Sequence, residues 1–240
     1  MKRFFTAALL LIACLSTEVI AKDEELLTAI QKLKDAGSYT WRCELNLTPG
    51  LTAPAIIEGK YNATQGVYVK VTSGKYSAEL AMRGKLIIAK TDQEWKPVKK
   101  FTRSDIDHSM VRALRDIAPP HLELPAVQDT WRTSRKNTPT LFEGQMNLGT
   151  AKKMISAAIQ QSGAIQLGSL NCDICKAAIT LANGLPERIV LEAQLSGGGG
   201  FLSRGTNARL SQMTQLLDVG STTIQLPPEA EAALVAEMLK

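Results

Sequence analysis

Residues 39–47, YTWRCELNL, alternate between apolar and polar side chains without a break. The apolar set occupies the odd positions and comprises Tyr39, Trp41, Cys43, Leu45 and Leu47. Because successive side chains of a strand point to opposite faces, the pattern predicts a strand that is buried on one face and exposed to water on the other. Such a strand is typical of an antiparallel sheet with a single apolar face.

Short segments with strand character follow, separated by Gly, Asn and Ser turn signals. They lie at 55–61, 67–72, 76–82 and 86–90, and a further short strand carries Glu94, Trp95 and Lys96. Consecutive short strands joined by tight turns predict an antiparallel meander.

The second half of the chain repeats this pattern after a strand expected at 141–148. Asn183-Gly184 is its strongest signal, because both residues tolerate the positive φ of a two-residue hairpin turn. The flanking strands are expected at 176–182 and 185–195, followed by strands at 207–217 and 222–226.

Helical spacing of apolar residues predicts helices between these groups of strands. They are expected at 23–36, from Ser104 to Ile117, from Thr150 to about 161, and after Pro227-Pro228. The proline-rich stretch 119–138 is interpreted as a connecting loop with little regular structure. Grouped strands predict an α+β fold, a large curved antiparallel sheet whose concave face is covered by helices.

Residues 1–21, MKRFFTAALLLIACLSTEVIA, have the features of an export signal. Lys2 and Arg3 precede an apolar stretch at 7–13, which is too short to span a bilayer. Two processing sites remain open. Cleavage after Ala21 would release a soluble protein, whereas the lipobox-like Leu11 to Cys14 would make Cys14 a lipidated N-terminus. The protein is expected in the periplasm or cell envelope, with residues 22–240 as a single domain.

Composition excludes some classes of function. The formal net charge is only +5 at pH 7, aromatic residues make up 5%, and the sequence contains no nucleic-acid-binding motif. Export also disfavours a nucleic-acid partner. No cofactor is expected.

Cys172-Asp173-Ile174-Cys175 is the only motif of a chemically specific type. A redox motif of this spacing needs a helix N-terminus, but here it leads into a strand. A zinc site would need further ligands, and Cys43, His108 and His121 lack ligand spacing. We interpret Cys172 and Cys175 as a local disulfide or as two unpaired thiols, with a thiol-disulfide protein as the remote alternative.

No catalytic or metal-binding residues are predicted. His108 and His121 are interpreted as surface residues, and no Gly-x-Ser-x-Gly motif is present. Gly197 to Gly200 fits a mobile hairpin connection and lacks the Gly-Lys-Ser/Thr of a phosphate loop. The protein is therefore not expected to be an enzyme.

The sequence resembles the LolA/LolB and LppX/LprG lipoprotein-carrier superfamily, and also exported proteins of planctomycete and verrucomicrobial bacteria. The resemblance rests on the first helix leading into Ser38-Tyr39-Thr40-Trp41, on the meander from Glu58 to Trp95, on the segment 183–186 before a long strand, and on the segment 217–222. It implies an incomplete barrel around an apolar cavity that takes acyl chains. The partner would then be a lipid or a lipoprotein acyl chain.

This resemblance implies a non-catalytic protein that binds or carries a lipid or acylated ligand. The alternative is a structural or protein-interaction module of the envelope with a filled interior. A lipid anchor at Cys14 would make the protein a tethered acceptor, and cleavage after Ala21 would make it a diffusing shuttle.

Overall fold

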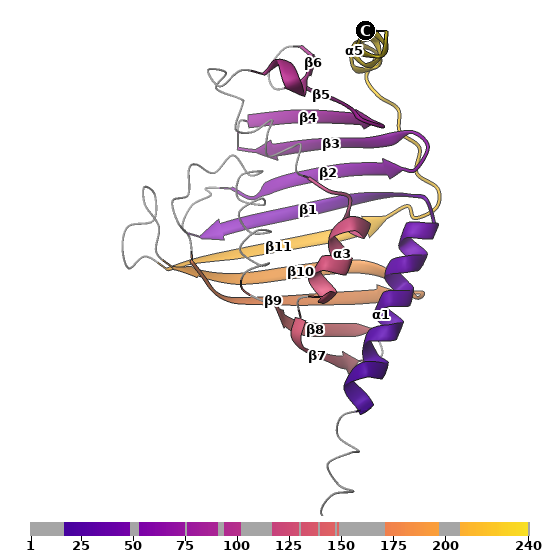
Figure 1. Cartoon of the computed structure of the whole chain (residues 1–240). Helices are drawn as coiled ribbons and strands as arrows, with labels where there is room; N and C mark the ends of the chain where they lie inside the picture. Colours follow the sequence, from indigo (N-terminus) through magenta and orange to yellow (C-terminus); the bar gives the residue numbers. More distant parts are fainter. Residues whose placement is uncertain are drawn as a thin grey trace, which may run out of the picture.

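A broad antiparallel sheet forms the centre of the molecule (Figure 1). The computed structural model describes residues 17–48, 53–74, 76–90, 94–101, 117–129, 131–138, 140–146, 148, 171–196 and 207–239. Within these ranges the sheet has 11 strands in the order β6-β5-β4-β3-β2-β1-β11-β10-β9-β8-β7. It is not closed into a barrel.

Two meanders build this sheet. The first comprises β1 (Ser38–Thr48), β2 (Ala55–Asn62), β3 (Gly66–Ser73), β4 (Tyr76–Arg83), β5 (Leu86–Lys90) and the short β6 (Lys96–Pro97). The second comprises β7 (Trp131–Thr138), β8 (Leu141–Met146), β9 (Asn171–Ala182), β10 (Leu185–Ser196) and β11 (Asn207–Leu217). They meet where β1 pairs with β11, so the first and last strands of the chain lie in the middle of the sheet.

The register separates the sheet into two faces. The inner face is defined here as the face on which β1 places Tyr39, Trp41, Cys43, Leu45 and Leu47, all of them buried. Their partners continue this face: Cys43 pairs with Ile57 on β2 and with Thr214 on β11. The outer face carries the intervening polar residues of β1.

Helices α1 (Thr17–Asp35) and α3 (Pro120–Asp129) contribute to the core of the inner face. Leu26, Ile30 and Leu33 of α1 and Leu124 and Val127 of α3 are buried in the same cluster as the apolar side of β1. Figure 1 shows both helices lying across the half of the sheet that contains β1 and β7–β11.

Helix α5 (Pro228–Met238) packs on the outer face instead. Its Ala230 and Leu234 form a second cluster with Ala81 of β4 and Ile88 of β5. Ala81 and Ile88 pair with each other and point away from their inner-face neighbour Leu80. The sequence predicted helices on the concave face of the sheet, and α5 differs because β4 and β5 carry apolar residues on both faces.

The fold class predicted from the sequence is confirmed, an α+β structure on a curved antiparallel sheet. The Asn183-Gly184 hairpin is also confirmed, since φ is 53° at Asn183 and 71° at Gly184, as a two-residue hairpin turn requires. The helix expected from Asp23 forms and begins earlier, at Thr17. Of the described helices, none is long and apolar enough to cross a membrane.

The interpretation of 119–138 as a loop is wrong. Pro120 occupies the first position of α3, where its missing N–H costs nothing, and β7 follows the helix. As an edge strand, β7 carries charges that hide its strand character in the sequence.

The strand expected at 222–226 does not form either. Its backbone bonds to side chains instead: Thr222 O accepts from Asn62 Nδ2 at 2.9 Å, and Ile224 N–H donates to Gln65 Oε1 at 2.7 Å. The helix expected from Ser104 to Ile117, except for Ile117 itself, lies outside the described residues, as do the helix expected from Thr150 to about 161 and the glycine run at 197–200.

Candidate functional site

Helix α3 is fastened to the sheet by a buried pair, Tyr39 on β1 and His121 on α3. The Tyr39 hydroxyl lies 2.6 Å from His121 Nδ1 and also accepts the backbone N–H of His121 at 3.2 Å. The hydroxyl proton is therefore donated to Nδ1, which places the proton of the neutral imidazole on Nε2. Burial and the nearby Lys34 lower the pKa of His121, so the neutral form is favoured.

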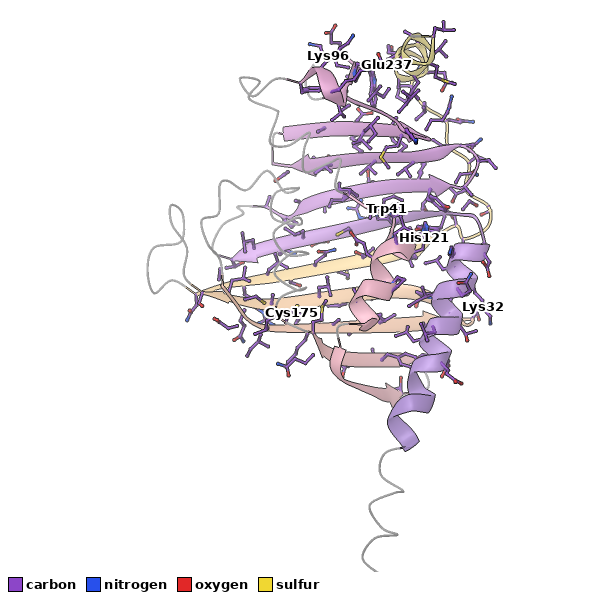
Figure 2. All side chains as sticks on the ribbon, viewed as in Figure 1. Lys32, Trp41, Lys96, His121, Cys175 and Glu237 are labelled. Carbon is purple, nitrogen blue, oxygen red and sulfur yellow. The ribbon has the colours of Figure 1, made fainter. Side chains whose placement is uncertain are left out.

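Aromatic rings surround this junction. Tyr61 of β2 lies 4.6 Å from the His121 ring and 5.3 Å from the Tyr39 ring, measured between centroids. Trp41 lies 5.9 Å from Tyr39. Figure 2 shows Trp41 of β1 near the end of α3 that carries His121. The rings form a rigid apolar wall at this end of the inner face.

Trp41 fits only because residue 59 is glycine. A Cβ added to Gly59, its partner on β2, would lie 2.0 Å from Cζ2 of the indole. The ring therefore lies flat on the backbone of β2, in the space that another residue would fill.

Next to this wall, polar groups interrupt the apolar inner face. The Cys43 thiol is hydrogen-bonded with the side chains of Thr214 and Gln212, both from β11. Glu123 of α3 interacts electrostatically with Cys43 and with Tyr39. Burial raises the pKa of the Glu123 carboxyl to about 7, so it is partly protonated near neutral pH.

The two cysteines singled out by the sequence lie on the same face of β9. Residues three apart on a regular strand face opposite sides, but the β9–β10 register shifts between Gln194 and Leu195. Cys172 pairs with Leu195 and Cys175 with Ala193, which leaves Asp173 as the extra residue of a β-bulge. Both thiols are buried in the inner core, where Cys175 Sγ lies 3.7 Å from Met146 Sδ.

The sequence interpretation of these residues has mixed outcomes. His121 is not a surface residue; it is buried because it bonds Tyr39. Cys43, Cys172 and Cys175 are thiols in this structure, so a disulfide between Cys172 and Cys175 stays a prediction. Cys14 and His108 lie outside the described residues. Among the described residues, no three His, Cys, Asp or Glu side chains gather as metal ligands.

Sequence reasoning missed the group formed by Tyr39, His121 and Glu123. Tyr39 was identified only as a member of the apolar face, and no pattern in the sequence links it to a helix more than 80 residues away. Pro119-Pro120 was the available signal, because proline is also favoured in the first turn of a helix.

No protein-family model and no curated protein matches the chain. Among solved structures, it resembles LprF from Mycobacterium bovis with a TM-score of 0.44 and 8% identity, over 86% of this chain and 96% of that chain. It also resembles a LolA superfamily protein from Nitrosomonas europaea with a TM-score of 0.30 and 8% identity, over 82% of this chain and 95% of the other. Both likenesses are reported as similarities in structure at low sequence identity.

Proposed function

We propose that this protein binds a lipid or another acylated ligand against the inner face of its sheet, without catalysis, as an exported protein of the cell envelope. The observation that carries the proposal is the composition of this face. Apolar residues extend across it from β4 to β8, and a polar group lies beside α3.

The apolar part of the inner face suits an acyl chain. Both meanders contribute to it, with members that include Ile57, Val69, Val71, Leu80, Phe142, Ile179, Leu191 and Leu210. Each methylene group buried against such a surface contributes about 0.8 kcal/mol. Affinity would therefore grow with chain length and would not require a charged anchor.

The polar part suits the head of the same ligand. Thr214, Gln212 and Glu123 offer donors and acceptors within an otherwise apolar surface. A protonated Glu123 can donate to an ester or carboxylate oxygen, as an ionised carboxylate cannot. The proposed ligand is thus amphiphilic, with its head beside α3 and its chain along the strands.

The chemistry of the cysteines supports a non-catalytic role. Burial raises the pKa of Cys43 and of Cys175 to about 12, so both are protonated at neutral pH. Thiols of this kind are weak nucleophiles. A thiol-disulfide enzyme would need the opposite shift.

Binding is tested first on protein purified from its own host, by native mass spectrometry under gentle conditions. We expect a co-purifying mass that organic extraction removes. A fluorescent fatty acid should then bind the extracted protein and be displaced by phospholipid. Protein that carries no lipid and does not take up the fatty acid would favour the alternative, an envelope interaction module with a filled interior.

A matched pair of variants places the site. Cys43→Phe adds a large ring to the inner face, whereas Glu44→Phe adds the same ring to the outer face of the same strand. We expect Cys43→Phe to weaken fatty-acid binding at least tenfold and Glu44→Phe to leave it unchanged. Circular dichroism checks that both variants fold. If Cys43→Phe does not fold, Thr214→Val tests the polar part of the site instead.

The leader decides how such a protein would work. Lipidation at Cys14 would hold it at a membrane as an acceptor, whereas cleavage between Ala21 and Lys22 would let it diffuse as a shuttle. Mass spectrometry of the mature N-terminus distinguishes an acylated Cys14 from a free Lys22.

A further inference from the structure

The bulge in β9 brings three sulfur atoms together. Cys172 and Cys175 interact directly, and Cys175 Sγ lies 3.7 Å from the sulfur of Met146. Met146 belongs to β8, whose Gln145 pairs with Lys176 of β9, so Met146 and Cys175 are cross-strand neighbours. All three are buried in the core of the inner face.

The bulge holds this arrangement without help from a ligand. The extra residue, Asp173, is exposed, and its Oδ1 accepts a hydrogen bond from Ser196 Oγ at 2.9 Å. This bond joins the bulge to the end of β10. The two thiols are therefore preorganised on one face by the backbone and by a contact on the other side of it.

Chemistry selects the ion that such a group would hold. Two thiols and a thioether are soft ligands, which prefer monovalent copper to hard cations. Zinc would require further ligands of the usual kinds, and among the described residues no third His, Cys, Asp or Glu gathers with this pair as a metal ligand, since Asp173 faces the other side of the strand.

A disulfide at the same positions would lie near the limit of its usual geometry. Cys172 and Cys175 are separated by two register steps along β10, about 6.6 Å at the usual rise of a strand. This separation is at the upper end of the roughly 4.4–6.8 Å that disulfides span between Cα atoms. An ion between the two sulfurs bridges a longer distance.

We propose that Cys172, Cys175 and Met146 form a binding site for a monovalent soft metal ion, Cu(I), at the β8–β9 end of the inner face. The cation enters already reduced and displaces one proton from each thiol, giving two thiolate bonds, a thioether contact and two released protons. No electron is transferred. Cys172, 9% exposed against 1% for the other two residues, is the point of entry.

Anaerobic titration of the reduced full chain tests the site, with Cu(I) in competition with a chromogenic chelator and with Ag(I) as a redox-inert probe. We expect one equivalent of either metal, two protons released, and a thiolate-to-metal absorption band in the ultraviolet. Competition by the chelator gives the affinity.

Variants assign the ligands. Cys172→Ser and Cys175→Ser should each weaken binding by more than the roughly 10- to 100-fold that loss of an outer partner costs. Met146→Leu, which conserves volume, should weaken it about tenfold. Cys43→Ser is the matched control, because Cys43 is a buried inner-face thiol with Thr214 and Gln212, not sulfur, as its hydrogen-bond partners.

The proposal would be overturned if no binding competes with the chelator, or if binding persists when Cys172 and Cys175 are both serine. Loss of binding in Cys43→Ser with retention in the other variants would do the same. If Cys175→Ser does not fold, Cys172→Ser and Met146→Leu still test the site. Cys172 lies at the rim of the core, so its substitution should disturb folding less.

Discussion

Gly59 faces the indole of Trp41 across the β1–β2 pair, and the absence of its side chain makes the position of the ring possible. Gly59→Ala would place a methyl group 2.0 Å from Cζ2, so the ring or the strand must move. We expect a loss of about 1–3 kcal/mol of unfolding free energy, measured by urea denaturation. In a Trp41→Leu background the same substitution should cost much less. Equal costs in both backgrounds would contradict this contact.

The Tyr39–His121 pair makes stability depend on pH. Burial lowers the pKa of His121 in the folded state, so this histidine binds a proton more readily in the unfolded chain. Stability contributed by neutral His121 is full above the ordinary histidine pKa of about 6.5 and is lost as the pH falls through the lowered value.

Urea unfolding between pH 5 and pH 8 measures this effect. His121→Gln, which keeps an acceptor for Tyr39, should be less sensitive to acid than the parent. His108→Gln, a change at the other histidine of the chain, is measured in parallel, so that any contribution of that histidine to the pH profile is separated from that of His121. An unchanged profile in His121→Gln would show that another group titrates.

Glu123 makes the stability of the protein depend on pH in the opposite direction. Its pKa is raised by burial to about 7, from 4.5, so the folded state binds the proton more readily than the unfolded chain does. The free-energy cost of burying the ionised Glu123 carboxylate is absent below pH 4.5 and grows as the pH rises to about 7. Glu123→Gln should therefore stabilise the protein at pH 8 by on the order of 2 kcal/mol and change little at pH 4. A stabilisation that is equal at both pH values would rule out ionisation as its cause.

At the scale of elements, the regular strands were predictable and the segments with tertiary partners were not. The inner strand β1 has period-2 alternation throughout, and Asn183-Gly184 encodes its own turn. By contrast, the segment 222–226 bonds to Asn62 and Gln65, more than 150 residues away, and local sequence does not record such partners.

The candidate site shows the same division. The apolar inner face follows from strand periodicity, so its residues on β1 and β10 were identifiable from the sequence. The position of His121 and Glu123 depends on how α3 packs, and the common face of Cys172 and Cys175 depends on a bulge. Both are tertiary features.

Helix α5 is held to the outer face by apolar contact more than by charge. Leu234 is fully buried against Ala81 and Ile88, whereas Val235, its neighbour in sequence, is 45% exposed. We expect Leu234→Ala to cost about 2–5 kcal/mol and Val235→Ala less than about 1 kcal/mol. Thermal unfolding measures both, and similar shifts would contradict the orientation of the helix.

The ion pair between Arg83 and Glu231 also joins β4 to this helix. Its two hydrogen bonds are 2.7 and 3.0 Å long, but both side chains are about one-third exposed or more. Because water screens such pairs, the cost of removing it should be at most about 1 kcal/mol. We therefore expect Leu234 to contribute more than this ion pair to the stability of the contact between α5 and the sheet.

For the whole molecule, the pairing of β1 with β11 joins two meanders that are each locally connected. This junction pairs Thr40 with Leu217, the two paired residues of the sheet that lie furthest apart in the sequence. It lies under the core that α1 and α3 share. The two ends of the sheet, β6 and β7, each pair on one side only within the described structure. Backbone amides near the junction should therefore open only in global unfolding, and those near the edges in smaller fluctuations.

Hydrogen exchange followed by mass spectrometry tests this gradient. We expect the slowest exchange in peptides from β1, β10 and β11, and faster exchange in β5–β6, β7 and α5, where fewer backbone groups are enclosed. Addition of a bound lipid should slow exchange further in the central strands and in α3, because a ligand stabilises the state that binds it. Protection that is uniform across the sheet, or greatest at β7, would mean that the two meanders are not joined through a central core.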